Sequence, residues 1–196
     1  MAQRRGPAWV IIVTGPPCGG KSRLAAVLAE RLCLPLVTKD AIKERLFDTL
    51  GWGGAERSDA LNRASVALML DTARLLFATG HPFILESNLR QDRDGEPYAE
   101  LLGEYGTQAI QVHCTAAAEV LIERFQRRWE AGQRHPGHAD DDAGMAIAAK
   151  IRAGTYGPLA LPGVLLQIDT SGGFADEDAL TAQVQRHIDT IEMAAQ

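Results

Sequence analysis

A glycine-rich segment near the start of the chain, residues 15–22 with the sequence GPPCGGKS, has the residue types and spacing of a phosphate-binding loop. Glycines let a backbone wrap around phosphate oxygens, Lys21 can neutralise the outer phosphates of a nucleoside triphosphate, and the Ser22 hydroxyl can bind Mg²⁺. Free N–H groups and the helix dipole at the start of a helix also favour anions. The segment therefore predicts ATP and Mg²⁺ as ligands, with these residues on the nucleotide: Gly15, Pro16, Pro17, Cys18, Gly19, Gly20, Lys21, Ser22 and Arg23.

Two carboxylates follow apolar segments that we expect to be strands, and ligands of parallel α/β sheets bind at such strand ends. Asp40 comes after residues 34–38, where it could cap the next helix or take the proton of an acceptor hydroxyl as a general base. The base is favoured, because capping explains the residue type but not its place at a strand end. Glu86 ends the apolar residues 83–85, and burial of an acid there is costly unless it meets a cation or metal-bound water. We expect Glu86 to order the Mg²⁺ shell or the acceptor, with a solvated strand end as the alternative.

Four arginines lie between residues 124 and 134, in the sequence RFQRRWEAGQR. Arginines that reach a transferring phosphoryl group stabilise the charge on its oxygens, and a lid that carries them excludes water. We expect a lid near residues 124–144, in which one or more of Arg124, Arg128 and Arg134 touches phosphate. The alternative is a solvated helix face whose arginines pair with acidic neighbours.

Hydrophobic patterning places these residues in a series of alternating strands and helices. Unbroken apolar runs are typical of strands buried on both faces, and they predict strands over residues 9–13, 34–38, 83–85, 108–114 and 164–169. Helical spacing predicts helices over residues 23–32, 40–50, about 59–79, 116–131 behind a Thr115 cap, 143–153 and 177–193. With right-handed crossovers, this order predicts a doubly wound, five-stranded parallel α/β sheet in a single domain over residues 1–196.

Composition limits the classes of function. The 196 residues carry a net charge of −5, which argues against a broad nucleic-acid-binding surface, although a local basic groove stays open. Three widely spaced cysteines indicate neither a disulfide framework nor a zinc site, so a reducing cytoplasm is expected. No apolar segment is long enough to span a bilayer, and we expect no membrane partner.

These motifs resemble the P-loop kinase superfamily of small phosphotransferases, and they are similar to the kinase domains of phage polynucleotide kinase, zeta toxins and chloramphenicol phosphotransferase. GPPCGGKS, Asp40 in VTKDAIKERL, the ESN stretch that begins at Glu86, and RFQRRWEAGQRHPGH occupy corresponding places. The resemblance implies the fold of P-loop containing nucleoside triphosphate hydrolases, Asp40 as base, and Arg128 or Arg134 as lid arginine. Glu86 stands where many relatives place Asp. The chain lacks an N-K-x-D guanine signature, so a GTPase switch is not expected.

The sequence thus predicts an ATP- and Mg²⁺-dependent kinase that transfers the terminal phosphoryl group to a hydroxyl of a small molecule. Lys21 and the loop hold the donor, Ser22 and Glu86 serve the metal, and the acceptor pocket involves residues 51–59, the helix after them and residues 88–93. Two alternatives stay open. One is a kinase for polynucleotide 5′-hydroxyl ends, and the other is a nucleotide-binding switch or ATPase without an acceptor.

Overall fold

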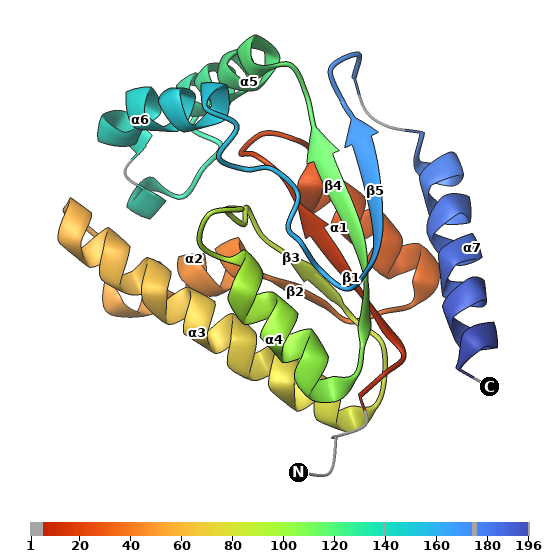
Figure 1. Ribbon diagram of the computed structural model, residues 1–196. Helices are drawn as coiled ribbons and strands as arrows, with labels where there is room; N and C mark the ends of the chain where they lie inside the picture. Colours follow the sequence, from red (N-terminus) through yellow and green to blue (C-terminus); the bar gives the residue numbers. More distant parts are fainter. Residues whose placement is uncertain (1–5, 139, 174–175, 196) are drawn as a thin grey trace.

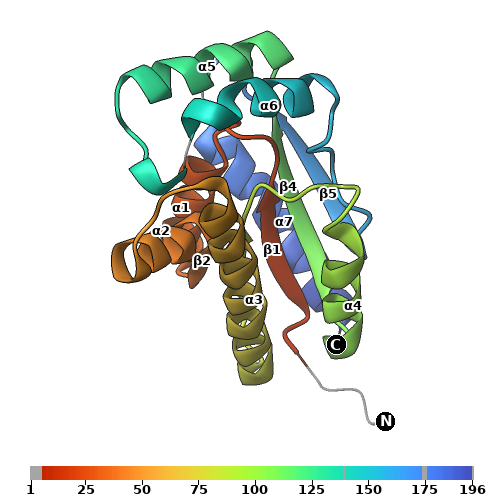
Figure 2. The same ribbon diagram turned by 90° about the vertical axis from the view of Figure 1, so that its left-hand side faces the viewer.

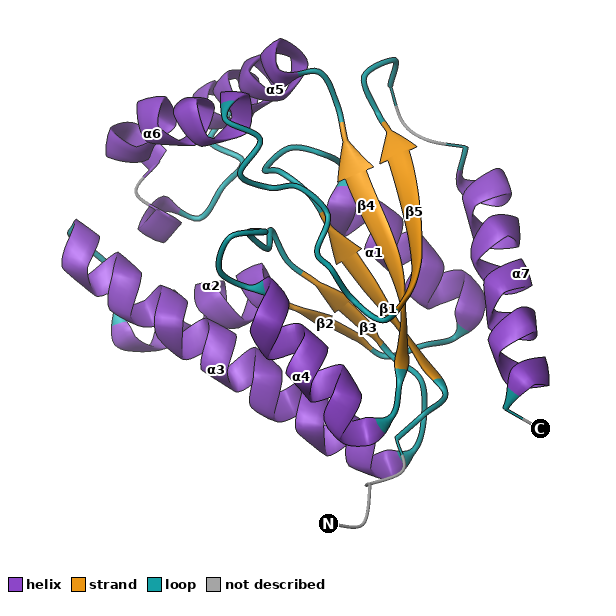
Figure 3. Cartoon of the chain, in the orientation of Figure 1, coloured by secondary structure: helices purple, strands orange, loops and turns teal. Residues whose placement is uncertain are grey.

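The computed structural model describes residues 6–138, 140–173 and 176–195, and it places a central sheet between two layers of helices (Figures 1 and 3). The strands are β1 (Trp9–Thr14), β2 (Leu36–Thr38), β3 (Ile84–Glu86), β4 (Gln108–Thr115) and β5 (Gly163–Asp169). The helices are α1 (Lys21–Leu32), α2 (Lys39–Leu50), α3 (Ala55–Thr79), α4 (Gly95–Tyr105), α5 (Ala118–Glu130), the 3₁₀ turn η1 (Pro136–His138), α6 (Asp140–Arg152) and α7 (Glu177–Ala194).

The sheet has the strand order β2-β3-β1-β4-β5, and all of these pairings are parallel. From β1 the chain crosses to the edge strand β2, returns to β3 beside β1, and then passes to β4 and β5 on the other side of β1. This arrangement confirms the predicted doubly wound, five-stranded parallel sheet. Its strand order reverses beside β1, and ligands of such sheets bind at that reversal.

The central strand β1 is fully buried because helices cover both faces of the sheet. Ile11 and Val13 pack with α1 and α7, whereas Val10 and Ile12 pack with α3 and α4. Successive residues of a strand point to opposite faces, so an unbroken apolar run is what this position requires. Figures 1 and 2 show the two layers on either side of the strands.

The register of the short strands aligns three strand ends. Glu86, the last residue of β3, is paired with Val13 of β1 on one side and with Thr38 of β2 on the other. The segment that follows β1 begins the phosphate loop, and the residues that follow Thr38 begin α2. Because the strands are parallel and in step, Glu86 lies between the phosphate loop and the start of α2.

A separate helical layer, made of α5, η1 and α6, lies over the carboxyl ends of the strands (Figures 1 and 2). It has a small core of its own, in which Leu121 of α5 packs with Ile151 of α6 and with Tyr156. The segment predicted as a lid, residues 124–144, lies within this layer, which extends beyond it at both ends. Its second helix begins at Asp140, three residues before the start that the sequence predicts, and η1 interrupts the expected loop.

Several local predictions are wrong. The helix α4 was not expected, although Tyr98, Leu101, Leu102 and Tyr105 have helical spacing and are buried. Helix α2 is capped by Thr38, whose hydroxyl accepts the N–H of Ala41 at 3.3 Å, so capping is not the role of Asp40. Helix α5 begins at Ala118 without a side-chain cap, because Thr115 continues β4. Helix α3 begins at Ala55, four residues earlier than expected. The C-terminal cap at Gly80 is confirmed.

The expectations from composition can be compared with the fold directly. Cys18, Cys33 and Cys114 are all free thiols. In the part of the chain that the structure describes, no helix is both long enough and apolar enough to cross a bilayer.

We expect Gly163→Ala to lower the free energy of unfolding by about 2 kcal/mol or more, because Gly163 has a φ of 123° and its added Cβ would lie 2.1 Å from the Ala109 carbonyl oxygen. Chemical denaturation measures the change. Gly103→Ala is the matched control, since an alanine there meets open space within helix α4 and should raise stability by up to about 1 kcal/mol. Equal stabilities of the two variants would contradict the close approach of β5 to β4.

Candidate active site

The phosphate loop leaves β1 through a turn that only glycine fits. Gly15 has a φ of 131°, and a Cβ at this position would lie 2.0 Å from the Cys114 carbonyl oxygen on β4. The loop then closes on itself, since the Gly19 N–H donates to the Pro16 carbonyl at 3.2 Å and Gly20, with a φ of 87°, begins helix α1. The close approach at Gly15 and the positive φ at Gly20 explain why these positions are glycines. The first N–H groups of α1 have no partner within the helix, so they are available at its head.

Lys21 lies inside this loop. Its side chain is buried, and its ammonium donates to the Pro16 carbonyl oxygen at 2.7 Å. The lysine is therefore held by an oxygen of its own loop, at the place where the loop surrounds the helix start. An ammonium in this position can exchange the carbonyl for phosphate oxygens without a large rearrangement.

Glu86 is the buried carboxylate of the site, with an exposed fraction of 4%. Burial raises its pKa, although the charges of Lys21 and Lys39 and the nearby Ser22 hydroxyl oppose that effect. A hydroxyl and a carboxylate oxygen are ligands that Mg²⁺ prefers, so Ser22 and Glu86 fit the predicted ion. A cation at this position would also compensate the cost of burying the carboxylate.

Asp40 extends into the same region from the first turn of α2. Its side chain is 48% exposed, and the Lys39 ammonium lies 3.2 Å from its carboxylate. Burial by itself raises the pKa of Asp40, but the positive charges of Lys39 and His138 outweigh it and hold the pKa at about 2. Asp40 is therefore an ionised, acceptor-only group at neutral pH.

Lys39 joins three elements around Asp40. Besides that carboxylate, its ammonium lies 3.3 Å from the Asn62 Oδ1 atom on α3 and 3.2 Å from the Asn88 Oδ1 atom after β3. Only 9% of the lysine is exposed. The sequence analysis does not single out Lys39 or Asn62, although their positions, directly after a strand and on the helix facing it, could have indicated them.

The lid arginines divide into two groups. Arg124 donates to the Thr170 hydroxyl and carbonyl oxygens at 3.0 and 2.5 Å, and Thr170 in turn contacts the Gly19 carbonyl. Arg128 lies near the Cys18 thiol in the phosphate loop and lowers its pKa against the effect of burial, and the charge of Arg134 acts on both Cys18 and Asp40. Arg124 therefore ties the lid to the loop after β5, whereas Arg128 and Arg134 lie close to the phosphate loop.

Other arginines of the region have different partners. Arg23 contacts Glu177 of α7 at 2.7 Å, and Arg127 pairs with Glu123 one turn earlier on α5. The alternative of a solvated helix face thus applies to Arg127.

Two histidines hold the lid against helix α2. His135 stacks on Phe47, with ring centroids 5.1 Å apart, and its Nε2 atom lies 3.2 Å from the Asp48 carboxylate. The edge of His138 meets the same phenyl ring, and its Nε2 atom lies 3.0 Å from the Glu44 carboxylate. The lid therefore contacts α2 directly in this structure. The described residues contain no group of three or more His, Cys, Asp or Glu side chains that could hold a metal ion.

These groups surround one cavity of about 1020 Å³ between the sheet ends and the lid. Among the described residues its wall carries eleven lysine and arginine side chains and four carboxylates, although the whole chain has a net charge of −5. Lys21, Ser22, Asp40, Glu86, Arg124, Arg128 and Arg134 all lie in the wall, as do Pro17, Cys18, Gly20 and Arg23. Gly15, Pro16 and Gly19 do not line the cavity, whereas the other sequence-predicted residues are brought together around a strongly basic space that suits phosphate oxygens.

Comparisons with known proteins place this site in a family. The AAA domain family AAA_33 matches residues 10–153. A crystal structure of a candidate kinase from Chloroflexus aurantiacus J-10-fl is 38% identical, with a TM-score of 0.84 over 93% of this chain and 99% of that one. An uncharacterized protein of Mycobacterium tuberculosis strain H37Rv is 29% identical over 148 residues, which are 72% of this chain but only 28% of that protein.

More distant structures share the fold. A shikimate kinase from Acinetobacter baumannii in complex with shikimate is 17% identical, with a TM-score of 0.55 over 96% of this chain and 95% of that one. A gluconokinase from Sinorhizobium meliloti 1021 is 16% identical, with a TM-score of 0.55 over 98% of this chain and all of that one. The chain therefore belongs to the AAA_33 family of AAA domains and has the fold of the P-loop small-molecule kinases, as its motifs predict.

Proposed function

We propose that the protein is an ATP-dependent kinase that transfers the terminal phosphoryl group to a hydroxyl of a small molecule. The observation that carries the proposal is the meeting of Lys21, the Ser22–Glu86 pair and the ionised Asp40 in one basic cavity. The Chloroflexus candidate kinase and the named shikimate kinase and gluconokinase support the same class of reaction.

The donor would bind in the phosphate loop. Its N–H groups at the head of α1 would contact the phosphate oxygens, and Lys21 would leave the Pro16 carbonyl for the outer phosphates. Ser22 and Glu86 would hold the Mg²⁺ ion that neutralises charge on these phosphates.

Asp40 is the proposed proton acceptor. A carboxylate with a pKa of about 2 is a weak base in the ground state. In a loose phosphoryl-transfer transition state, the hydroxyl acidifies as it bonds to phosphorus, so an oriented carboxylate suffices to take the proton. The cations that lower the pKa of Asp40 therefore also keep its carboxylate ionised, and so able to accept a proton, over the working pH range.

The lid and the size of the cavity support a small acceptor. Arg128 and Arg134 would stabilise the charge on the transferring oxygens, and the layer of α5, η1 and α6 would keep water from the phosphoryl group. A volume of about 1020 Å³ has the size of a small-molecule site, and the ionised Asp40 favours transfer over simple nucleotide binding.

We expect Asp40→Asn to lower phosphoryl transfer by about 10²- to 10⁴-fold while the affinity for ATP changes little, because Asp40 would act on the acceptor and not on the donor. The measurement is an acceptor screen with labelled ATP, followed by kinetics on the acceptor found. Asp71→Asn, an exposed carboxylate paired with Arg74 on α3, is the control. If slow ATP hydrolysis were the only activity and Asp40→Asn left it unchanged, the protein would be a nucleotide-binding ATPase instead.

We also expect Arg128→Gln to reduce kcat by about 10²- to 10³-fold, with a smaller effect on KM for the acceptor. Arg127→Gln is the matched control, since Arg127 is its neighbour on α5 but pairs with Glu123. Equal losses in both variants would show that the charge of the helix as a whole, and not one placed arginine, supports catalysis.

A further inference from the structure

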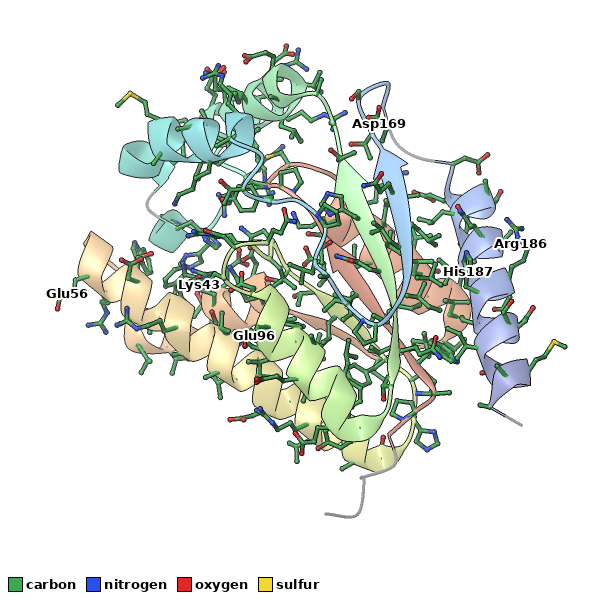
Figure 4. The ribbon with its side chains drawn as sticks, in the orientation of Figure 1. Lys43, Glu56, Glu96, Asp169, Arg186 and His187 are labelled. Carbon is green, nitrogen blue, oxygen red and sulfur yellow. The ribbon has the colours of Figure 1, made fainter. Side chains whose placement is uncertain are left out.

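The buried face of helix α2 is made of two lysines and a phenylalanine. Lys39, Lys43 and Phe47 follow one another at intervals of four residues, and they are 9%, 7% and 0% exposed. Hydrophobic patterning predicts Ile42 and Leu46 on the inner side with Phe47, but both are only half-buried. Both lysines line the cavity, and Figure 4 labels Lys43 in the region between α3 and the lid.

The two lysines differ in their partners. Lys39 contacts the Asp40 carboxylate and the Asn62 and Asn88 side-chain oxygens. Lys43 meets the Ser58 hydroxyl at 3.4 Å, and its ammonium lies 5.2 Å from the centre of the Phe47 ring. Among the described residues no carboxylate lies within 4.0 Å of this ammonium. Lys43 is thus a buried cation whose close contacts are a hydroxyl and an aromatic face.

Without a bound ligand, the two buried lysines lower the stability of the folded protein. Two like charges four residues apart on a helix destabilise it, and burial adds the cost of removing an ammonium from water. Burial and the neighbouring charge of Lys39 also lower the pKa of Lys43. A methionine of similar length would fill the same space without either cost. The charge therefore indicates a ligand rather than a packing role.

The place of Lys43 along α2 sets its distance from the strand ends. Thr38 is paired with Glu86, and α2 begins at the next residue, Lys39. Lys43 lies one helical turn farther along this helix. The charges that act on Lys43 are those of Lys39, Asp40, Arg134 and Asp59.

We propose that Lys43, assisted by Lys39, binds an anionic oxygen group, phosphate or carboxylate, carried by the phosphoryl acceptor. The inference rests on the proposed function and specifies its substrate class: a small hydroxyl compound with a negative charge about one helical turn, roughly 5–6 Å, from the hydroxyl that reacts. The ammonium of Lys43 would gain a counterion in the cavity, and Ser58 would donate a further hydrogen bond to the anion.

The test measures anion binding directly. The full chain is first saturated with Mg²⁺ and AMP-PNP, which occupies the phosphate loop, and it is then titrated calorimetrically with inorganic phosphate and, separately, with acetate. We expect one or both anions to bind, and Lys43→Met to weaken that binding at least 10-fold. Whichever anion binds more tightly identifies the group as phosphate or carboxylate.

Arg45→Gln is the control variant, because Arg45 lies on the same helix with a side chain that is 82% exposed. Its anion affinity should equal that of the parent chain. Unchanged anion affinity in Lys43→Met, or no anion binding by the parent chain, would overturn the inference. Failure to bind AMP-PNP would count against the kinase proposal instead, and the phosphate titration of parent and variant would then proceed without nucleotide.

Stability provides a second readout. Since Lys43→Met removes a buried charge that has no carboxylate within 4.0 Å among the described residues, its denaturation midpoint should equal or exceed that of the parent chain. A lower midpoint with unchanged phosphate affinity would assign Lys43 a structural role and overturn the inference. Lys43→Gln, which keeps a polar group beside Ser58, replaces the methionine variant if that variant does not fold.

Discussion

The turn at Gly15 is the constraint on which the site depends. The backbone at the end of β1 approaches the Cys114 carbonyl so closely that no side chain fits between them. This contact fixes where the phosphate loop begins relative to β4, and the parallel register then places Glu86 beside the end of β1 and next to the start of α2. Lys21, Glu86 and Asp40 come from three separate segments, yet they meet because three strand ends are held in step.

The surroundings of Glu86 and Asp40 shift the pKa values of these two carboxylates in opposite directions. Burial raises the pKa of Glu86, whereas the cations around Asp40 hold its pKa at about 2. Where the surroundings give two neighbouring carboxylates different pKa values, the two groups can take different chemical roles. The buried group gains most from a cation and suits a metal, while the ionised, half-exposed group can face an acceptor. The net negative charge of the chain gives no hint of this basic cavity, because the cations are gathered in one place.

Much of the fold could be predicted because its central strand must be apolar on both faces. Asp40 and Glu86 could be predicted as site residues in the same way, because each follows or ends an apolar segment that must be a strand. It could not identify Lys43, since a lysine in a helix is usually solvated and only the packing of α2 against α3 buries this one. Helix α4 was missed although its tyrosines and leucines have helical spacing, and Arg124 could be tied to Thr170 only once the loop after β5 was placed.

Phe47 connects the lid to the helix that carries Asp40 and the two buried lysines. Its ring is fully buried and touches His135 and His138 of the lid, while its other neighbour along the same face of α2 is Lys43. The lid therefore covers Phe47, the last of the three buried residues Lys39, Lys43 and Phe47 along α2. Any shift of α2 on binding an acceptor would move the surface on which the histidines rest, and with it the segment that holds Arg134. The helix that carries Asp40 and the segment that carries Arg134 are thus in direct contact, and such packing is what a lid that closed on a bound substrate would need.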